Sequence, residues 1–274
     1  MSAAKDEFTQ FEHEGWQRVA DKYDSVWAQS TRQFIPPLLE AAEVSAGMSV
    51  LDVGSGPGYV AAAARQRGAV PTGLDFSKQM VSIAKRMFPG IEFREGDAQS
   101  LPFQDSSFDR VLANFALLHL SDPERACAEA CRVLKRGGRF GFTVWAEAAD
   151  NPYAQLIDDA IDAHADLAVK LPSGPPYYLY KTKKDFRQAM ERAGFNGASM
   201  THAIHRIEWI VPTPSYPFEA ELNAGVRTAG FLAAQPPDRL SAIRSAIEKK
   251  VKEYAKGNRF AIPKAAYIIG LAKR

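Results

Sequence analysis

An acidic residue followed by a glycine-rich turn stands in the first quarter of the sequence, where Asp52 precedes Gly54, Gly56 and Gly58. Residues 49–53 form a short apolar run typical of a buried strand, and a helical pattern begins directly after the turn. Glycines at a strand-to-helix turn let backbone N–H groups approach a ligand that a Cβ would hold away. The pattern predicts a site for a nucleotide-like ligand, with Asp52 next to a cationic or hydroxyl-bearing part of it.

The spacing of these glycines narrows the class of ligand. Residues 54–58 read G-x-G-x-G, whereas the dinucleotide fingerprint is G-x-G-x-x-G. A phosphate-binding loop would also need a lysine after its last glycine, and none follows here. The turn alone is therefore weak evidence, and it matches neither of these two phosphate-binding motifs.

Two further acidic residues, Asp75 and Asp97, follow predicted strands at residues 69–74 and 91–94. Parallel strands bring their carboxyl ends to one edge of a sheet, so both side chains are expected on the same rim as Asp52. Asp75 stands near the roughly 20-residue offset at which a second-strand carboxylate binds ribose hydroxyls. Asp97, between two small residues, is suited to the edge of a base. Taken singly, each could equally be a polar loop residue.

His119 is the candidate general base of the sequence. It follows the predicted strand at residues 107–113 and the polar residue Asn114 at the end of that strand. A histidine titrates near neutral pH and can take a proton from a hydroxyl group that attacks an electrophile. The alternative is a structural histidine that packs the turn before Asp122.

The elements that must position these residues alternate between strand and helix. A fifth strand is predicted at residues 139–145, and the helix before it begins at Asp122 with Pro123 in its first turn. That helix is expected to run to Lys135-Arg136 and to end at Gly137-Gly138. The alternation predicts an α/β fold with a doubly wound parallel sheet and helices on both faces.

Composition limits the functions that the chain can have. Its 274 residues are 46% hydrophobic and 24% charged, with a net charge of +2, so a polyanionic partner such as nucleic acid is not expected. The polar start lacks the apolar core of a secretory signal, and no apolar run reaches the roughly 18 residues of a membrane span. Cys127 and Cys131 are expected to be reduced core residues without a metal, as in a cytoplasmic protein.

The motifs in order resemble the class I S-adenosylmethionine-dependent methyltransferases, and within them the ubiquinone/menaquinone-biosynthesis-like (methyltransferase type 11) group. The resemblance covers roughly residues 44–146 and rests on four stretches in family order: VLDVGSGPG, GLDFS, GDAQSLPFQDSSFDRVLANFALLHL and RVLKRGGRFGFTVW. It implies S-adenosylmethionine as the cofactor and a Rossmann-like, seven-stranded sheet. In such a sheet the last strand, here Phe260 to Ala272, runs antiparallel to its neighbours.

The resemblance also implies roles for residues on the rim. Asp52 would lie near the cofactor's amino group, and Asp75 would bind the ribose hydroxyls. The methionine part would lie against the glycine turn and the end of the fourth strand, at Gly54, Ser55, Gly56, Gly58, Asn114 and Phe115. The adenine would be bound by Phe76, Asp97 and Ala98.

The chain is expected to consist of three parts with different roles. Residues 1–35 would form an N-terminal helical lid, residues 36–146 the cofactor-binding core, and residues 147–274 the remainder of the sheet. Two insertions in the last part, 147–185 and 212–258, would cover the substrate, and one or two helices are expected across 216–256. The candidate acceptor contacts are Tyr23, Trp27, Trp145 and Tyr178.

The expected function is methyl transfer to a small, apolar or aromatic molecule, with oxygen favoured over nitrogen or carbon as the accepting atom. One alternative is an NAD(P)-dependent oxidoreductase of similar architecture. Another is a non-catalytic homologue that binds the cofactor but has lost the acceptor site. The lid and insertions, which would select the acceptor, carry no diagnostic residues, so the sequence does not name it.

Overall fold

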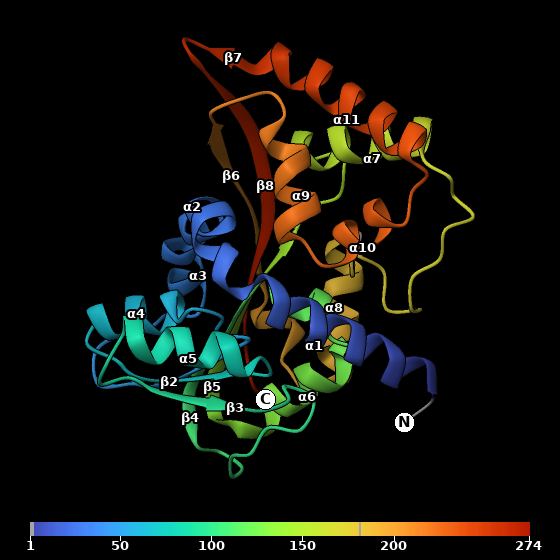
Figure 1. Ribbon diagram of the computed structural model, residues 1–274. Helices are drawn as coiled ribbons and strands as arrows, with labels where there is room; N and C mark the ends of the chain where they lie inside the picture. The colour runs from blue at the N-terminus through green and yellow to red at the C-terminus, as the bar shows by residue number, and fades with distance from the viewer. Residues whose placement is uncertain (1–2, 181) are drawn as a thin grey trace.

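The computed structural model describes residues 3–180 and 182–274, with one mixed sheet flanked by helices (Figure 1). Seven strands follow one another in the order β3-β2-β1-β4-β5-β8-β6, and the two-residue β7 pairs with β8 at the side. The strands are β1 (Ser49–Val53), β2 (Val70–Asp75), β3 (Glu92–Glu95), β4 (Phe108–Asn114), β5 (Leu134–Trp145), β6 (Thr201–Val211), β7 (Ala255–Lys256) and β8 (Arg259–Ala272).

The direction of pairing confirms the predicted Rossmann-like sheet. Strands β1 to β5 pair in parallel with one another, and β8 runs antiparallel to both β5 and β6. Side chains alternate between the two faces of each strand. In β1 and β4, for example, Val50 and Leu112 pack with α3 and α4, whereas Leu51 and Val111 pack with α6. The sheet is therefore buried on both faces, as an all-parallel core requires.

Eleven α-helices occur among the described residues, together with short 3₁₀ turns and a π-helical turn at Asp24–Ala28. The α-helices are α1 (Ala3–Tyr23), α2 (Gln29–Thr31), α3 (Ile35–Ala41), α4 (Tyr59–Gln66), α5 (Lys78–Met87), α6 (Pro123–Val133), α7 (Pro152–His164), α8 (Lys183–Arg192), α9 (Tyr216–Ala224), α10 (Arg227–Ala233) and α11 (Pro237–Val251). None of these helices is long and apolar enough to cross a membrane.

The start of α6 is as predicted, but its end is not. The Asp122 side chain accepts from the Arg125 backbone N–H, and Pro123 occupies the first turn. The helix nevertheless ends at Val133, and the next residue already pairs with Phe108 of β4. Lys135 to Gly138 form an irregular part of β5, where the register with β4 shifts. Lys135 forms an ion pair with Asp109 of β4 instead of closing the helix.

The insertion before the last strand contains three helices, α9, α10 and α11, where one or two were expected. Gly225 ends α9 in an extended conformation, and Pro236 precedes α11, which begins at Pro237. The cluster that covers these helices includes Ile243, Ile247 and Val251, so the apolar stripe of α11 faces the core as its spacing indicates.

Strands β6 and β8 continue beyond the end of β5, and this extension carries the upper half of the molecule in Figure 1. The ladder between β5 and β8 ends at the pair Trp145–Ala266, whereas β6 pairs with β8 as far as Phe260. Helices α7, α9 and α11 pack against the extension through a second apolar cluster. Helix α1 crosses in front of the sheet and contacts α5 and α9.

Candidate active site

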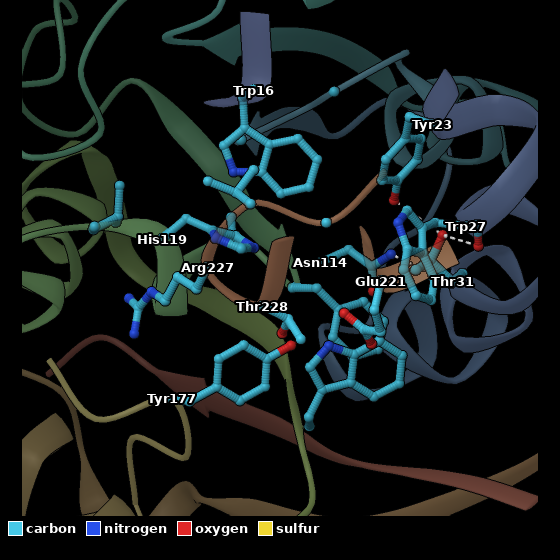
Figure 2. A pocket seen from close by; sticks show the side chains of 18 of the residues that line it. Trp16, Tyr23, Trp27, Thr31, Asn114, His119, Tyr177, Glu221, Arg227 and Thr228 are labelled. Carbon is cyan, nitrogen blue, oxygen red and sulfur yellow. Dashed lines mark hydrogen bonds between the residues drawn. The ribbon is translucent and has the colours of Figure 1, made fainter. Parts of the chain in front are cut away.

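A cavity of about 550 Å³ lies where the carboxyl ends of β1, β2 and β4 meet the helical cover. This volume is within the range of small-molecule sites, about 300–1,000 Å³. Its wall is drawn from all three parts of the chain. Figure 2 shows Trp16, Tyr23 and Trp27 from the N-terminal segment around the same space as His119 from the core and Tyr177, Glu221 and Arg227 from the C-terminal half.

The glycine turn forms one side of the cavity through Gly54, Ser55 and Gly56. Gly54 has a φ of 65°, and a Cβ on it would lie 2.4 Å from the Cβ of Ala116, so both its conformation and its surroundings require glycine. Gly58 lies behind the wall, where a Cβ would meet the Phe93 ring at 2.6 Å. The turn thus holds backbone close to the cavity without side chains in the way.

Asp75 lies at the end of β2 on the cavity wall, together with Phe76. Its carboxylate accepts from the backbone N–H of Gly56 at 2.8 Å and of Ser77 at 2.9 Å, so it ties the glycine turn to the start of α5. Burial raises the pKa of Asp75 to about 6, although these two hydrogen bonds lower it. The carboxylate keeps free lone pairs, which suit hydroxyl donors.

Asp97 is placed differently from the other acidic residues of the rim. Its Oδ1 accepts from the backbone and side-chain N–H groups of Gln99, and the residue lines a smaller cavity that adjoins the first at Phe76 and His119. Ala98, the next residue, lines the main cavity. The structure therefore brings Ala98 to the main wall and leaves Asp97 beside it.

Asp52 is fully buried beneath the glycine turn rather than on the cavity wall. Its Oδ2 accepts from the Ala61 backbone N–H at 3.0 Å, but within residues 3–180 and 182–274 its Oδ1 has no hydrogen-bond partner. Ser55, on the wall, has an Oγ that likewise lacks a partner among these residues. Burial raises the pKa of Asp52 to about 7. Two polar atoms without partners next to a glycine turn fit a ligand with a polar, cationic end.

The burial of Asp52 predicts how stability depends on pH. Its pKa rises from 3.8 when exposed to about 7 in the folded protein, so the folded state binds the extra proton in between. The proton on Asp52 therefore stabilises the folded state fully below about pH 4. As the pH rises to about 7 this stabilisation is lost, and the free energy of unfolding falls by at most about 4 kcal/mol. In Asp52→Asn, urea unfolding across this range should show a smaller fall in stability than in the wild type. An identical fall in both proteins would contradict the assignment.

Asn114 and Phe115 end β4 on the cavity wall. The Asn114 Oδ1 accepts from the Thr143 hydroxyl at 2.6 Å, which fixes the amide. Phe115 has a φ of 56°, a left-handed conformation that is uncommon for a bulky residue, and its ring stacks on Trp145 with centroids 3.9 Å apart. The backbone therefore turns away sharply at the strand end and leaves the cavity open beside it.

His119 lines both cavities and is held by a buried carboxylate. Its Nδ1 lies 3.0 Å from Oε2 of Glu12, which is 0% exposed, and the other Glu12 oxygen accepts from Nε of Arg227 at 2.7 Å. Burial alone would raise the pKa of Glu12, but His119 and Arg227 outweigh it, so the pKa is lowered. The Trp16 ring packs edge-on against the imidazole, with centroids 4.8 Å apart. Helix α1 therefore orients the candidate base of the core.

Arg227 connects the His119–Glu12 pair to the segments that cover the cavity. Its guanidinium donates to the backbone carbonyls of Pro175 and Leu118 as well as to Glu12. The loop before α8, helix α10 and helix α1 thus meet over His119. Arg227 also lies over the Phe8 ring, 4.5 Å from its centroid.

All four candidate acceptor contacts line the cavity. Tyr23 shares a 3.0 Å hydrogen bond with Thr31, Trp27 donates from its indole to the Ala224 carbonyl at 2.9 Å, and Tyr178 donates to Asp158 at 2.9 Å. Trp145 stands against Phe115, as described above. The polar groups of Tyr23, Trp27 and Tyr178 are therefore already paired, and these three residues offer mainly ring surface to a ligand.

Sequence reasoning missed Glu12, Arg227, Glu221 and Lys264, all of which lie at or beside the cavity. Two of these residues, Glu12 and Lys264, have a recognisable pattern around them in the sequence. Glu12 lies four residues from both Phe8 and Trp16, so it is the carboxylate on an otherwise aromatic helix stripe. Lys264 is the lysine within the apolar run of the last strand. Both break a hydrophobic pattern at a buried position.

Comparison with known proteins identifies the class. The methyltransferase domain family, type 11, matches residues 51–142. The demethylmenaquinone methyltransferase of Paenarthrobacter aurescens is 34% identical over 59% of this chain and 66% of its own length. That of Renibacterium salmoninarum is 33% identical over 59% of this chain and 70% of its own length. The crystal structure of YcgJ from Bacillus subtilis has the same fold, with a TM-score of 0.56, 21% identity, and coverage of 88% of this chain and 98% of that one.

The fold and the cavity at the strand ends define a Rossmann-like enzyme that uses S-adenosylmethionine as its cofactor. The chain belongs to the class I S-adenosylmethionine-dependent methyltransferases, in the menaquinone/ubiquinone-type group. It is therefore a methyltransferase and not a nicotinamide-dependent oxidoreductase. The matched segment spans only about two thirds of the first relative's length, and the acceptor does not follow from the match.

Proposed function

We propose that this enzyme transfers a methyl group to a hydroxyl oxygen of a small, apolar or aromatic molecule, with His119 as general base. The observation that carries the proposal is the His119–Glu12 pair on the wall of an aromatic-lined cavity. With Glu12 accepting from Nδ1, a neutral imidazole has Nε2 left to accept a proton from the acceptor.

When bound, S-adenosylmethionine supplies an electrophilic methyl group on a sulfonium that leaves as a neutral thioether. The residues described above fit it. Asp75 would accept from the ribose hydroxyls, and Phe76 and Ala98 would contact the adenine, with Asp97 beside them. Asp52 and Ser55, whose oxygens lack partners among the described residues, would face the amino acid end across the turn at Gly54, Gly56 and Gly58. Asn114 and Phe115 would border the methyl group.

The protein's largest contribution to such a displacement is alignment in an enclosed space, worth about 7–11 kcal/mol. Residues 1–35 and the insertions 147–185 and 212–258 would supply the enclosure. Tyr23 and Trp27 come from the first of these, and Tyr178 from the second. Trp145 would form the floor next to Phe115. The acceptor would lie between these rings, with its hydroxyl toward His119.

A second candidate reaction is methylation of a ring carbon. It is favoured by the names of the sequence relatives, demethylmenaquinone methyltransferases. The same cavity and base would serve, because an acidic hydroxyl on the ring must also lose its proton to make the ring carbon nucleophilic. The two reactions differ in the atom that receives the methyl group.

An experiment with a ¹³C-methyl donor separates the two. The pure enzyme would be incubated with the donor and a small-molecule extract, and the product identified by mass and by the chemical shift of its labelled carbon, which differs between O-, N- and C-methyl groups. A methoxy carbon is the expected result. A label only on carbon or nitrogen would overturn O-methylation, and His119→Gln should suppress the same product.

A further inference from the structure

A lysine lies inside the apolar wall of the cavity. Lys264 is 1% exposed and belongs to β8, two residues before the last pair of that strand with β5. Because side chains alternate along a strand, it shares a face with Ile262 and Ala266, which are fully buried. It is thus at the point where β8 leaves β5, and its side chain lines the cavity.

The surroundings of Lys264 are aromatic on four sides. Its Nζ lies 4.8 Å from the ring centroid of Trp27, 4.5 Å from Trp145, 4.3 Å from Tyr153 and 4.7 Å from Trp209. Ring faces attract an ammonium group, but they do not accept hydrogen bonds as oxygens do. Lysine is almost never fully buried unless it is paired. Among the residues that the structure describes, the ammonium group of Lys264 therefore contacts ring faces rather than a carboxylate at ion-pair distance.

A carboxylate on the wall of the same cavity is already engaged by other side chains. Glu221 of α9 lines the same cavity, and its Oε1 accepts from the Tyr153 hydroxyl at 2.6 Å. Thr228 is a further hydrogen-bond partner of this carboxyl group. Among the described residues, no carboxylate lies within the 4.0 Å of an ion pair with Lys264. Burial raises the pKa of Glu221 and lowers that of Lys264 to about 7, while the carboxylate favours the charged lysine.

We propose that Lys264 binds a negatively charged oxygen of the methyl acceptor, a carboxylate or a phenolate. This inference rests on the proposed function, because it places the acceptor in the aromatic end of the cavity. The ammonium group would donate to the oxyanion, and the rings of Trp27 and Trp145 would pack on the apolar body of the same molecule. The acceptor would then be held at two places, by its charged group at Lys264 and by its methyl-accepting atom near His119.

Calorimetric binding to the complex with S-adenosylhomocysteine tests this with two matched pairs of probes. Benzoate and benzamide differ mainly in the charge of the carboxyl group, and 4-nitrophenol and 4-nitroanisole differ in the presence of an ionisable oxygen. Lys264→Met keeps the length of the side chain and removes its charge. Lys249→Met, on the exposed face of α11, is the matched control.

In the wild type and in Lys249→Met, at least one of the two anions should bind at least about tenfold more tightly than the neutral compound paired with it. Tenfold corresponds to about 1.4 kcal/mol in binding free energy. Whichever pair shows the preference identifies the oxyanion as carboxylate or phenolate. Lys264→Met should lose the preference while keeping its affinity for S-adenosylhomocysteine, which reports an intact fold. An equal preference in Lys264→Met, or no preference in the wild type, would overturn the assignment. If the wild type itself failed to bind S-adenosylhomocysteine, that result would instead contradict the cofactor site.

Discussion

Replacing His119 with glutamine is expected to slow methyl transfer by about 10²–10⁴-fold, the usual contribution of a general base. Glutamine can occupy the same space but cannot take a proton from a hydroxyl acceptor. Turnover would be measured with labelled methyl donor on the acceptor that the isotope experiment identifies. The affinity for S-adenosylhomocysteine, measured by calorimetry, should change little, because the proposed contacts to the cofactor come from other residues.

Glu12 gives a second test of this role, because its carboxylate contacts the His119 imidazole as well as Arg227. Glu12→Gln should lower the rate less than His119→Gln does, because the imidazole can still take a proton but no longer faces a carboxylate that balances the charge it gains. His164→Gln, at the end of α7, is the control and should have the wild-type rate. An unchanged rate in His119→Gln would remove this residue from the mechanism.

The second large effect is expected at Asp75. Asp75→Asn should weaken binding of S-adenosylhomocysteine by about 10²-fold or more, because hydrogen bonds to a charged group contribute about 1.5–3 kcal/mol each and ribose offers two hydroxyl donors. The amide would also present a donor toward Gly56 or Ser77, whose N–H groups both point at the carboxylate. The measurement is calorimetric titration of the variant and the wild type.

Asp75 also predicts a pH dependence of binding. The pKa of its carboxyl group in the free protein is about 6, so affinity should be full well above that pH and should fall as the pH drops through it. Asp97→Asn is the matched control, because Asp97 lies beside the main cavity and already accepts from Gln99. Its loss of affinity should be several-fold smaller. Equal losses in the two variants would contradict the proposed division of roles.

The position of several predicted cofactor contacts on the cavity wall follows from the sequence, because these residues lie at strand ends and in one turn. Asp75 and Asn114 end β2 and β4, and Gly54 to Gly58 directly follow β1, so the strand order alone brings this end of the sheet to the cavity wall. The burial of Asp52 could not be predicted in this way. Its depth beneath the turn depends on how α4 packs, and that packing leaves one carboxylate oxygen without a partner among the described residues.

The acceptor side could not be predicted, because its polar residues meet only through tertiary contacts. Glu12 lies 107 residues from His119 and 215 residues from Arg227. No periodicity links a residue of α1 to a residue of α10. Lys264 similarly meets Trp27 and Trp209 only because β8 extends beyond β5 and carries the inserted helices. At Glu12 and at Lys264, the only indication in the sequence is a charged residue within an otherwise apolar pattern.

The end of α6 shows a different limit. Lys135, Arg136 and the two glycines that follow are typical of a helix C-terminus, but the same residues suit an irregular strand start. The ion pair of Lys135 with Asp109 and the pairing of Leu134 with Phe108 favour the strand. Tertiary pairing therefore overrides a local signal at this boundary.

Calorimetric titration of the pure protein with S-adenosylhomocysteine tests the central claim most directly. We expect saturable binding of one molecule per chain, displaced by S-adenosylmethionine and weakened in Asp75→Asn. No heat and no displacement with either compound, from a protein that is folded by circular dichroism, would contradict a cofactor site in this cavity.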